Sequence, residues 1–129
     1  MTEQHAITQP VCLTFPATDV RNRINNAHAQ LEQRKRSAVT THCQYWDTIH
    51  PGQYEHWRFE QGWDLGFRDT IAFFGMRSQH CLEGGDKIGM LDLWCLKRLR
   101  DSGQTGAFVW EFEQGLRQGI CDFYECAGV

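Results

Sequence analysis

The sequence predicts an all-α fold: a compact four-helix domain with a short N-terminal arm or strand and an internal pseudo-repeat over 57–71 and 110–124. Three observations support it: the repeat itself, apolar residues spaced three and four apart, and a hydrophobic content of 41% over 129 residues. The repeat is gapless. Its copies share Trp57, Phe59, Glu60, Gln61, Gly62, Gly66 and Asp69 with Trp110, Phe112, Glu113, Gln114, Gly115, Gly119 and Asp122. This length favours a single domain over 1–129.

The N-terminal third predicts an arm over 1–17 followed by a helix. Within the arm, 11–15 is briefly strand-like before Pro16 closes it. Thr18 or Asp19 is a suitable cap for a helix that runs to about Ala38. Its apolar stripe is narrow, which is typical of a helix on a surface, and consists of Val20, Ile24, Ala27 and Leu31. Residues 39–52 are expected to form a connection that ends at Pro51-Gly52.

Three more helices are predicted after this connection. One spans about 52–74, carries the first copy of the repeat and ends near Gly75, a residue suited to left-handed termination. After a loop over 76–85, Asp86 begins a helix over about 87–100 with a broad apolar face. The last helix spans about 106–125 and carries the second copy.

The glycines inside the two repeat helices predict a close crossing. Each glycine costs about 1 kcal/mol relative to alanine in a helix interior, so two per helix need a steric reason. Gly62, Gly66, Gly115 and Gly119 have the spacing that lets helix backbones approach one another. We expect the two helices to cross at these glycines, related by a pseudo-twofold axis. The alternative is that each glycine makes room for a neighbouring tryptophan.

Charge and cysteine usage indicate a cytoplasmic protein that does not bind a membrane. The net charge is −3, with an excess of basic residues in 1–40 and of acidic residues in 41–129, so direct binding of nucleic acid is not expected. No segment has the pattern of a signal peptide or a membrane span. The six cysteines are expected to be free thiols, as in a reducing compartment.

No motif predicts a catalytic residue, a cofactor or a metal. The adjacent pairs His42-Cys43 and His80-Cys81 lack zinc-site spacing, and His56 lies four residues before Glu60 without a counterpart in the second copy. Two alternatives stay open. One is a small metal- or thiol-dependent enzyme or sensor that uses the Cys and His residues. The other is a nucleic-acid-binding regulator acting through 21–36, which ends in the basic cluster Arg34-Lys35-Arg36.

The preferred interpretation is a non-enzymatic module that binds a protein partner, in one version a nucleic-acid-binding complex. Aromatic and acidic side chains are the expected contacts, because Trp and Tyr are enriched in interface hot spots and acidic groups steer association. The candidates are Tyr45, Trp46, Tyr54, Glu55, Asp64, Asp101, Glu111 and Glu125. A homodimer that packs through the glycine grooves is a further possibility.

The segment Phe59-Glu-Gln-Gly-Trp-Asp-Leu-Gly-Phe-Arg-Asp69 resembles helices in small phage- and plasmid-encoded accessory proteins. Some proteins of that kind inhibit host defence systems such as CRISPR complexes. The likeness covers about twenty residues per copy and implies no particular functional residue. It implies an anti-CRISPR-like inhibitor of a host defence complex, encoded by a mobile element, which is an expectation by analogy.

Overall fold

The structure, a computed structural model, describes residues 12–13, 17–77, 82–83 and 96–128 and confirms the all-α prediction. Its long helices are α2 (Ala17–Ile49), α3 (His56–Arg77) and α5 (Val109–Ala127). Residues 96–101 are also helical. Two-residue strands β1 (Cys12–Leu13) and β2 (Leu82–Glu83) pair antiparallel, with Cys12 opposite Glu83. The strand-like expectation for the arm is therefore confirmed at its centre.

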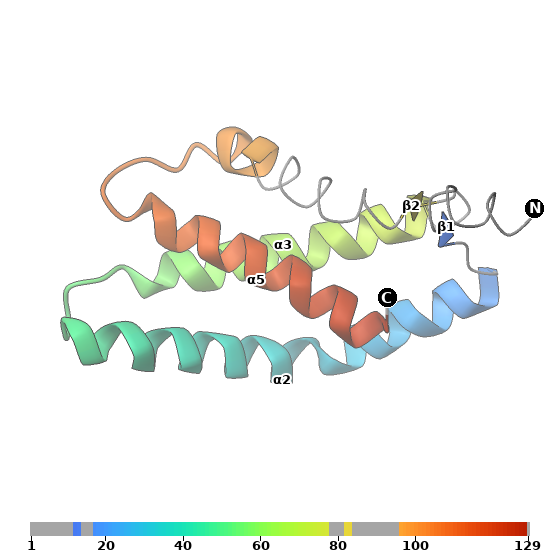
Figure 1. The fold of residues 1–129 in the computed structure, drawn as a ribbon, viewed down its shortest axis with the longest axis horizontal. Coiled ribbons are helices and arrows are strands. Elements are labelled where there is room, and N and C mark those ends of the chain that lie inside the picture. The colour runs from blue at the N-terminus through green and yellow to red at the C-terminus, as the bar shows by residue number, and fades with distance from the viewer. Residues whose placement is uncertain (1–11, 14–16, 78–81, 84–95, 129) are drawn as a thin grey trace, which may run out of the picture.

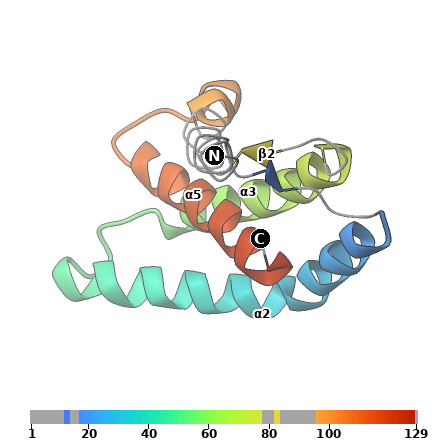
Figure 2. The same cartoon turned by 45° about the vertical axis from the view of Figure 1, so that its right-hand side comes forward.

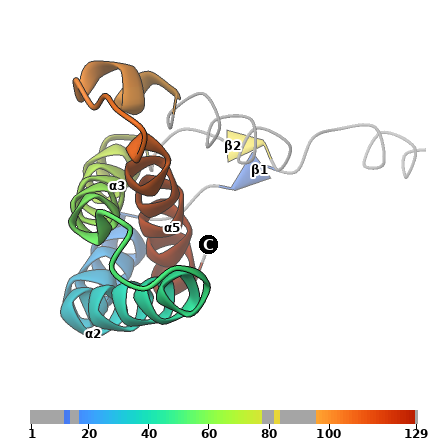
Figure 3. The ribbon, with the colours of Figure 1, turned by 90° about the vertical axis from the view of Figure 1, so that its left-hand side faces the viewer.

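The three long helices pack around a common interior. α2 and α3 run in opposite directions as a hairpin, whereas α5 crosses α3 while running the same general way (Figure 1). The turned view of Figure 2 shows α5 passing across α3 and ending beside α2, and the end-on view of Figure 3 shows the three helices at the corners of a triangle. The helical segment 96–101 lies beyond the start of α5, on the side away from α2.

The predicted glycine crossing is confirmed. A methyl group on Gly62 would come closer than 3.0 Å to the backbone carbonyl oxygen of Phe112, and one on Gly115 would do the same to that of Phe59. The second pair repeats this relation, because Gly66 meets Leu116 and Gly119 meets the carbonyl of Trp63. Phe59 and Phe112 are equivalent repeat positions, so the contacts are reciprocal. The two helices pack backbone to backbone, as in the small-xxx-small packing of parallel helix pairs.

The core surrounds this crossing and is covered by α2. Phe59, Trp63 and Phe67 of α3 are buried, as are their counterparts Phe112, Leu116 and Ile120 of α5. From α2, the predicted stripe residues Val20, Ala27 and Leu31 are buried and Ile24 is partly buried. The indole Nε1 of Trp63 donates to Asp122 Oδ2 at 2.8 Å, which supplies the partner that a buried indole requires.

The helix boundaries differ from the sequence predictions at several ends, including the start of α2 at Ala17, before the predicted caps, and the start of α3 at His56 rather than near 52. The connection predicted over 39–52 is wrong, because α2 continues to Ile49. Thr and aromatic residues there have modest helix propensity, but Ala38, Val39 and His42 extend the inward stripe and tertiary packing prevails. Gly75 does not terminate α3, which runs on to Arg77. Most of the helix predicted over 87–100, with its cap at Asp86, lies outside the described residues.

Candidate functional site

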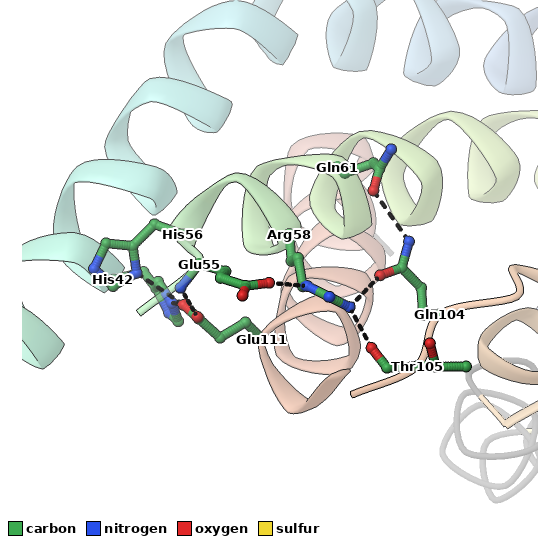
Figure 4. Close-up of polar contacts among 8 residues, drawn as sticks. All are labelled: His42, Glu55, His56, Arg58, Gln61, Gln104, Thr105 and Glu111. Atoms are coloured by element: carbon green, nitrogen blue, oxygen red, sulfur yellow. Dashed lines mark hydrogen bonds and ion pairs between the residues drawn. The ribbon is translucent and has the colours of Figure 1, made fainter. Parts of the chain in front are cut away.

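A buried cluster of two histidines and one carboxylate joins the three long helices at one end of the bundle (Figure 4). Glu111 Oε1 lies 2.9 Å from His42 Nε2 and 2.8 Å from His56 Nδ1. The other oxygen, Oε2, accepts the backbone N–H of Glu55 at 2.6 Å. The Glu111 side chain is 0% exposed, His42 4% and His56 19%. A single carboxylate therefore links α2, the start of α3 and the start of α5.

Local structure explains why these side chains meet. Glu111 lies in the first turn of α5, and Glu55 directly precedes α3, where backbone N–H groups lack helical partners. A carboxylate at that position satisfies one such donor and interacts favourably with the positive end of the α3 dipole. His42 reaches the same point from α2 only because that helix extends beyond its predicted end.

His56 bridges two carboxylates. Its Nδ1 faces Glu111, and its Nε2 lies 2.8 Å from Asp47 Oδ1. A carboxylate accepts hydrogen bonds and cannot donate one, so both ring nitrogens carry protons in this arrangement. Burial lowers the pKa of His56, but the hydrogen bonds to Asp47 and Glu111 outweigh it and raise the pKa overall. The imidazolium charge of His56 compensates the buried charge of Glu111.

His42 has the opposite electrostatic character. Burial lowers its pKa more than the hydrogen bond to Glu111 raises it, so the ring is neutral and donates through Nε2. Its ring stacks on Phe59 with centroids 3.9 Å apart and meets His56 edge-on at 5.2 Å. Trp46 and Trp110, 4.7 Å apart, complete an aromatic shell that limits the access of water to the cluster.

The first repeat copy has an arginine where the second has Glu111. Arg58 Nε donates to Glu55 Oε1 at 2.6 Å, and its NH1 donates to Gln104 Oε1 at 2.9 Å and to the Thr105 carbonyl at 2.8 Å (Figure 4). These hydrogen bonds hold the loop that precedes α5 against α3. Equivalent positions of the repeat therefore hold different neighbours: Arg58 holds the 104–105 loop, and Glu111 holds α2.

A groove of about 620 Å³ borders the cluster, between α2 and α5. The α2 side includes Tyr45 and Trp46, whose rings meet edge to face at 5.0 Å, and His42 from the cluster. The α5 side includes the amides of Gln114 and Gln118 and the guanidinium of Arg117. Tyr45 is 61% exposed. An open aromatic ring beside amide and guanidinium donors is typical of a binding surface.

The predicted partner-binding residues are dispersed. Tyr45 and Trp46 line the groove, whereas Tyr54 packs against Trp46 and His56 in the aromatic shell. Glu111 is fully buried, so it belongs to no partner-facing surface. The others make contacts within the domain or lie on its surface: Glu55 binds Arg58, Asp64 binds Lys35, Glu125 binds Arg34, and Asp101 is exposed.

Three of the five basic residues in 21–36, the segment of the nucleic-acid alternative, form ion pairs within the fold, whereas Arg21 and Arg36 are exposed. Arg34 NH1 lies 2.8 Å from Glu125 Oε1, and Lys35 Nζ lies 3.2 Å from Asp64 Oδ2. Arg23 pairs with Asp19 and donates to the carbonyl of Gly128 at the end of α5. These side chains attach α2 to the other helices, which accounts for them without nucleic acid.

Cys43, Cys121 and Cys126 are free, as expected. The His42–His56–Glu111 cluster was missed, because no spacing motif connects residues so far apart in the chain. The available signal was the mismatch between Arg58 and Glu111 inside the otherwise identical runs 57–62 and 110–115. None of the helices in the described ranges is long and apolar enough to cross a lipid bilayer.

Among curated proteins, the chain is similar to an uncharacterized glycosyl hydrolase of Saccharomyces cerevisiae, with 30% identity over 98 residues. The match covers 73% of this chain but 18% of the relative. The chain thus corresponds to a small part of that protein's length. No solved structure matches the chain.

A sequence profile described as the glucan 1,3-beta-glucosidase 3 C-terminal domain matches residues 27–127, which include all of the cluster and the groove. This match overturns the expected phage or plasmid inhibitor of a CRISPR complex, and it gives no support to the enzyme, sensor or nucleic-acid alternatives. The buried residues of the segment that carried the likeness, Phe59, Gly62, Trp63, Gly66 and Phe67, pack α3 against the rest of the fold and are not specific to a function. The chain belongs to the glucan 1,3-beta-glucosidase 3 C-terminal domain family.

Proposed function

We propose that this chain is an accessory domain of a glucan-acting glycosyl hydrolase and that it binds glucosyl units in the groove between α2 and α5. The family description and the relative's name supply the substrate class, and the chain's 18% share of that relative leaves room for a separate catalytic part. The single observation that carries the proposal is the exposed ring of Tyr45 on a groove lined by polar side chains.

The groove has the two kinds of group that a pyranose needs. A glucosyl ring has apolar C–H faces, which pack on aromatic rings, and a rim of hydroxyls that donate and accept hydrogen bonds. Tyr45 and Trp46 offer ring surface at right angles to one another. Gln114, Gln118 and Arg117 offer amide and guanidinium groups from the opposite wall. The volume is within the range of small-molecule sites.

Binding of a hexameric β-1,3-linked gluco-oligosaccharide to this chain, followed by NMR titration, tests the proposal. We expect shift changes at groove residues and at least tenfold weaker binding by Tyr45→Ala, a loss equivalent to about 1.4 kcal/mol. Trp57→Ala is the matched control, because Trp57 is 58% exposed, similar to Tyr45, and is not among the groove-lining residues. Absence of binding by the unaltered chain, or equal weakening in both variants, would refute groove binding.

A protein contact is the second candidate, and we propose the catalytic part of the same polypeptide as the partner. Trp57 carries this candidate: it is an exposed tryptophan with the Arg58 guanidinium 5.1 Å from its ring centroid, and both residue types are enriched in interface hot spots. Hydrogen exchange around 55–60 should be slower in a full-length polypeptide than in the isolated chain. Equal exchange would remove this candidate.

A cytoplasmic location is part of the proposal as well. The free thiols of Cys43, Cys121 and Cys126 support a reducing compartment, where structural disulfides are rare. Cell fractionation tests it, and recovery of the protein only from the extracellular fraction would contradict it.

A further inference from the structure

We propose that His42, His56 and Glu111 form a binding site for one divalent transition-metal cation, with Zn²⁺ the best fit, that joins α2, α3 and α5. The proposed metal site uses imidazole nitrogens and a carboxylate oxygen, whereas the saccharide groove uses aromatic ring surface and polar side chains. The inference therefore does not depend on the proposed function. We assign the site a role in joining the three helices and no catalytic role.

Three ligand atoms converge on one point from three elements. His42 Nε2, His56 Nδ1 and a Glu111 carboxylate oxygen all lie within 4.8 Å of one another. Both imidazole nitrogens are directed at Oε1, at 2.9 Å and 2.8 Å (Figure 4). Two imidazoles and one carboxylate are a ligand set that Zn²⁺ accepts in tetrahedral sites, whereas Ca²⁺ and Mg²⁺ prefer oxygen ligands.

The groups around the ligands orient them as the second layer of a metal site does. The Nε2 of His56 faces Asp47 Oδ1 at 2.8 Å, so its Nδ1 is the nitrogen left for a metal. A carboxylate on the far nitrogen of a ligating histidine is the common arrangement in zinc proteins. The Glu55 N–H fixes Glu111 Oε2 at 2.6 Å, which leaves Oε1 as the ligand oxygen.

Burial favours a cation at this place. The Glu111 carboxylate is 0% exposed and therefore needs a compensating positive charge close by. Without a metal, that charge is the proton on His56 Nδ1. When the cation binds, the His56 Nδ1 proton is released to solvent, and His42 changes tautomer so that its proton moves from Nε2 to Nδ1. The fourth position then goes to water, which reaches the site beside His56, its 19% exposed member.

The test is titration of the purified, chelator-treated chain with Zn²⁺ alone, using a chromophoric chelator as competitor, and with Co²⁺ followed by visible absorption. We expect one ion per chain, a Kd below about 1 µM and an absorption band of tetrahedral Co²⁺. Glu111→Gln and His56→Gln should each weaken binding at least 100-fold. His28→Gln is the matched control, because His28 is an exposed histidine of α2 that is not part of the cluster, and it should bind as the unaltered chain does.

The outcomes separate a metal site from a hydrogen-bonded cluster. A Kd weaker than about 100 µM for the unaltered chain would overturn the proposal, as would equal affinity in His28→Gln and His56→Gln. Circular dichroism identifies any variant that fails to fold. If Glu111→Gln unfolds, His42→Gln and His56→Gln carry the comparison. If all cluster variants unfold, the affinity and the Co²⁺ spectrum of the unaltered chain decide.

Discussion

The glycine crossing and the His–Glu cluster use the same repeat in opposite ways. At the crossing, Gly62 and Gly115 occupy equivalent positions and make equivalent contacts, each against the backbone of the other helix. One position after the repeat's tryptophan, the copies diverge to Arg58 and Glu111, and their contacts diverge with them. Among the positions that the copies share, the phenylalanines and the glycines build the interior. Position 58 and its equivalent 111, where the copies differ in charge, attach neighbours that exist on one side only.

The difference has a physical origin in the third helix. A pair of repeat helices related by a twofold axis offers the same surface on both sides, but α2 covers only one side of this pair, as Figure 3 shows. A buried carboxylate is useful on the side where His42 and His56 donate to it. On the other side, the 104–105 loop offers acceptor oxygens. An arginine, which donates hydrogen bonds, is therefore better suited to that side than a carboxylate.

The largest effect is expected at the crossing, for Gly115→Ala. The new methyl group would overlap the Phe59 carbonyl, and the overlap is relieved only if the helices separate. We expect a loss of about 3 kcal/mol in the free energy of unfolding, measured by urea denaturation. Gln114→Ala, at an exposed position of the same helix, is the control and should change little. A tolerated alanine at 115 would mean that the backbones are not in contact.

The next effect is expected at the cluster, for Glu111→Gln. The amide keeps the shape of the carboxylate but loses its charge and presents N–H groups where acceptors are needed, opposite two histidines and one backbone N–H. We expect a loss of about 2 kcal/mol, from hydrogen bonds to a charged group, in chemical denaturation. A change below about 0.5 kcal/mol would show that the carboxylate is not the group that holds α2.

A substitution at the equivalent position of the first copy, Arg58→Ala, should lower the free energy of unfolding less than Glu111→Gln does. Its guanidinium holds a loop rather than a helix, and its contacts are only partly buried. We expect a loss of about 1 kcal/mol, together with faster hydrogen exchange confined to 102–108. If this variant is as destabilised as Glu111→Gln, the two sides of the repeat do not differ as described.

The smallest effect is expected for Glu125→Ala. Its partner is Arg34, but the Glu125 side chain is 67% exposed, so solvent screens the pair. We expect a change of at most about 0.5 kcal/mol in thermal or urea denaturation. A substantially larger loss would show that surface ion pairs, and not the crossing and the cluster, attach α2 to the rest of the bundle.

The crossing could be predicted from the sequence because its cause is local and repeated. Two glycines four residues apart, at matching places in two helices, leave few steric explanations, and the reciprocal contacts of Gly62 and Gly115 confirm the favoured one. The helix ends were harder to predict from the sequence. Gly75 offered a plausible terminator, and the Thr-rich stretch after Ala38 offered a plausible break. Packing against the interior carried both helices further.

The cluster could not be predicted in the same way. His42, His56 and Glu111 come from three elements, and their meeting depends on α2 running ten residues past Val39 to Ile49. Without that extension, His42 falls in a loop and Glu111 looks like an exposed acid of the last helix. The function was misjudged for a related reason. The apolar and glycine residues of the segment that resembled phage accessory proteins serve packing, and such a pattern occurs in many unrelated helices.

The most direct test of the central claim, that the two repeat helices touch backbone to backbone at their glycines, is the set of NMR nuclear Overhauser contacts of the glycine Hα protons. We predict contacts from Gly62 to the backbone of Phe112 and Leu116, and reciprocal contacts from Gly115 to the backbone of Phe59 and Trp63. Assigned glycine resonances that show contacts only within their own helix would contradict it.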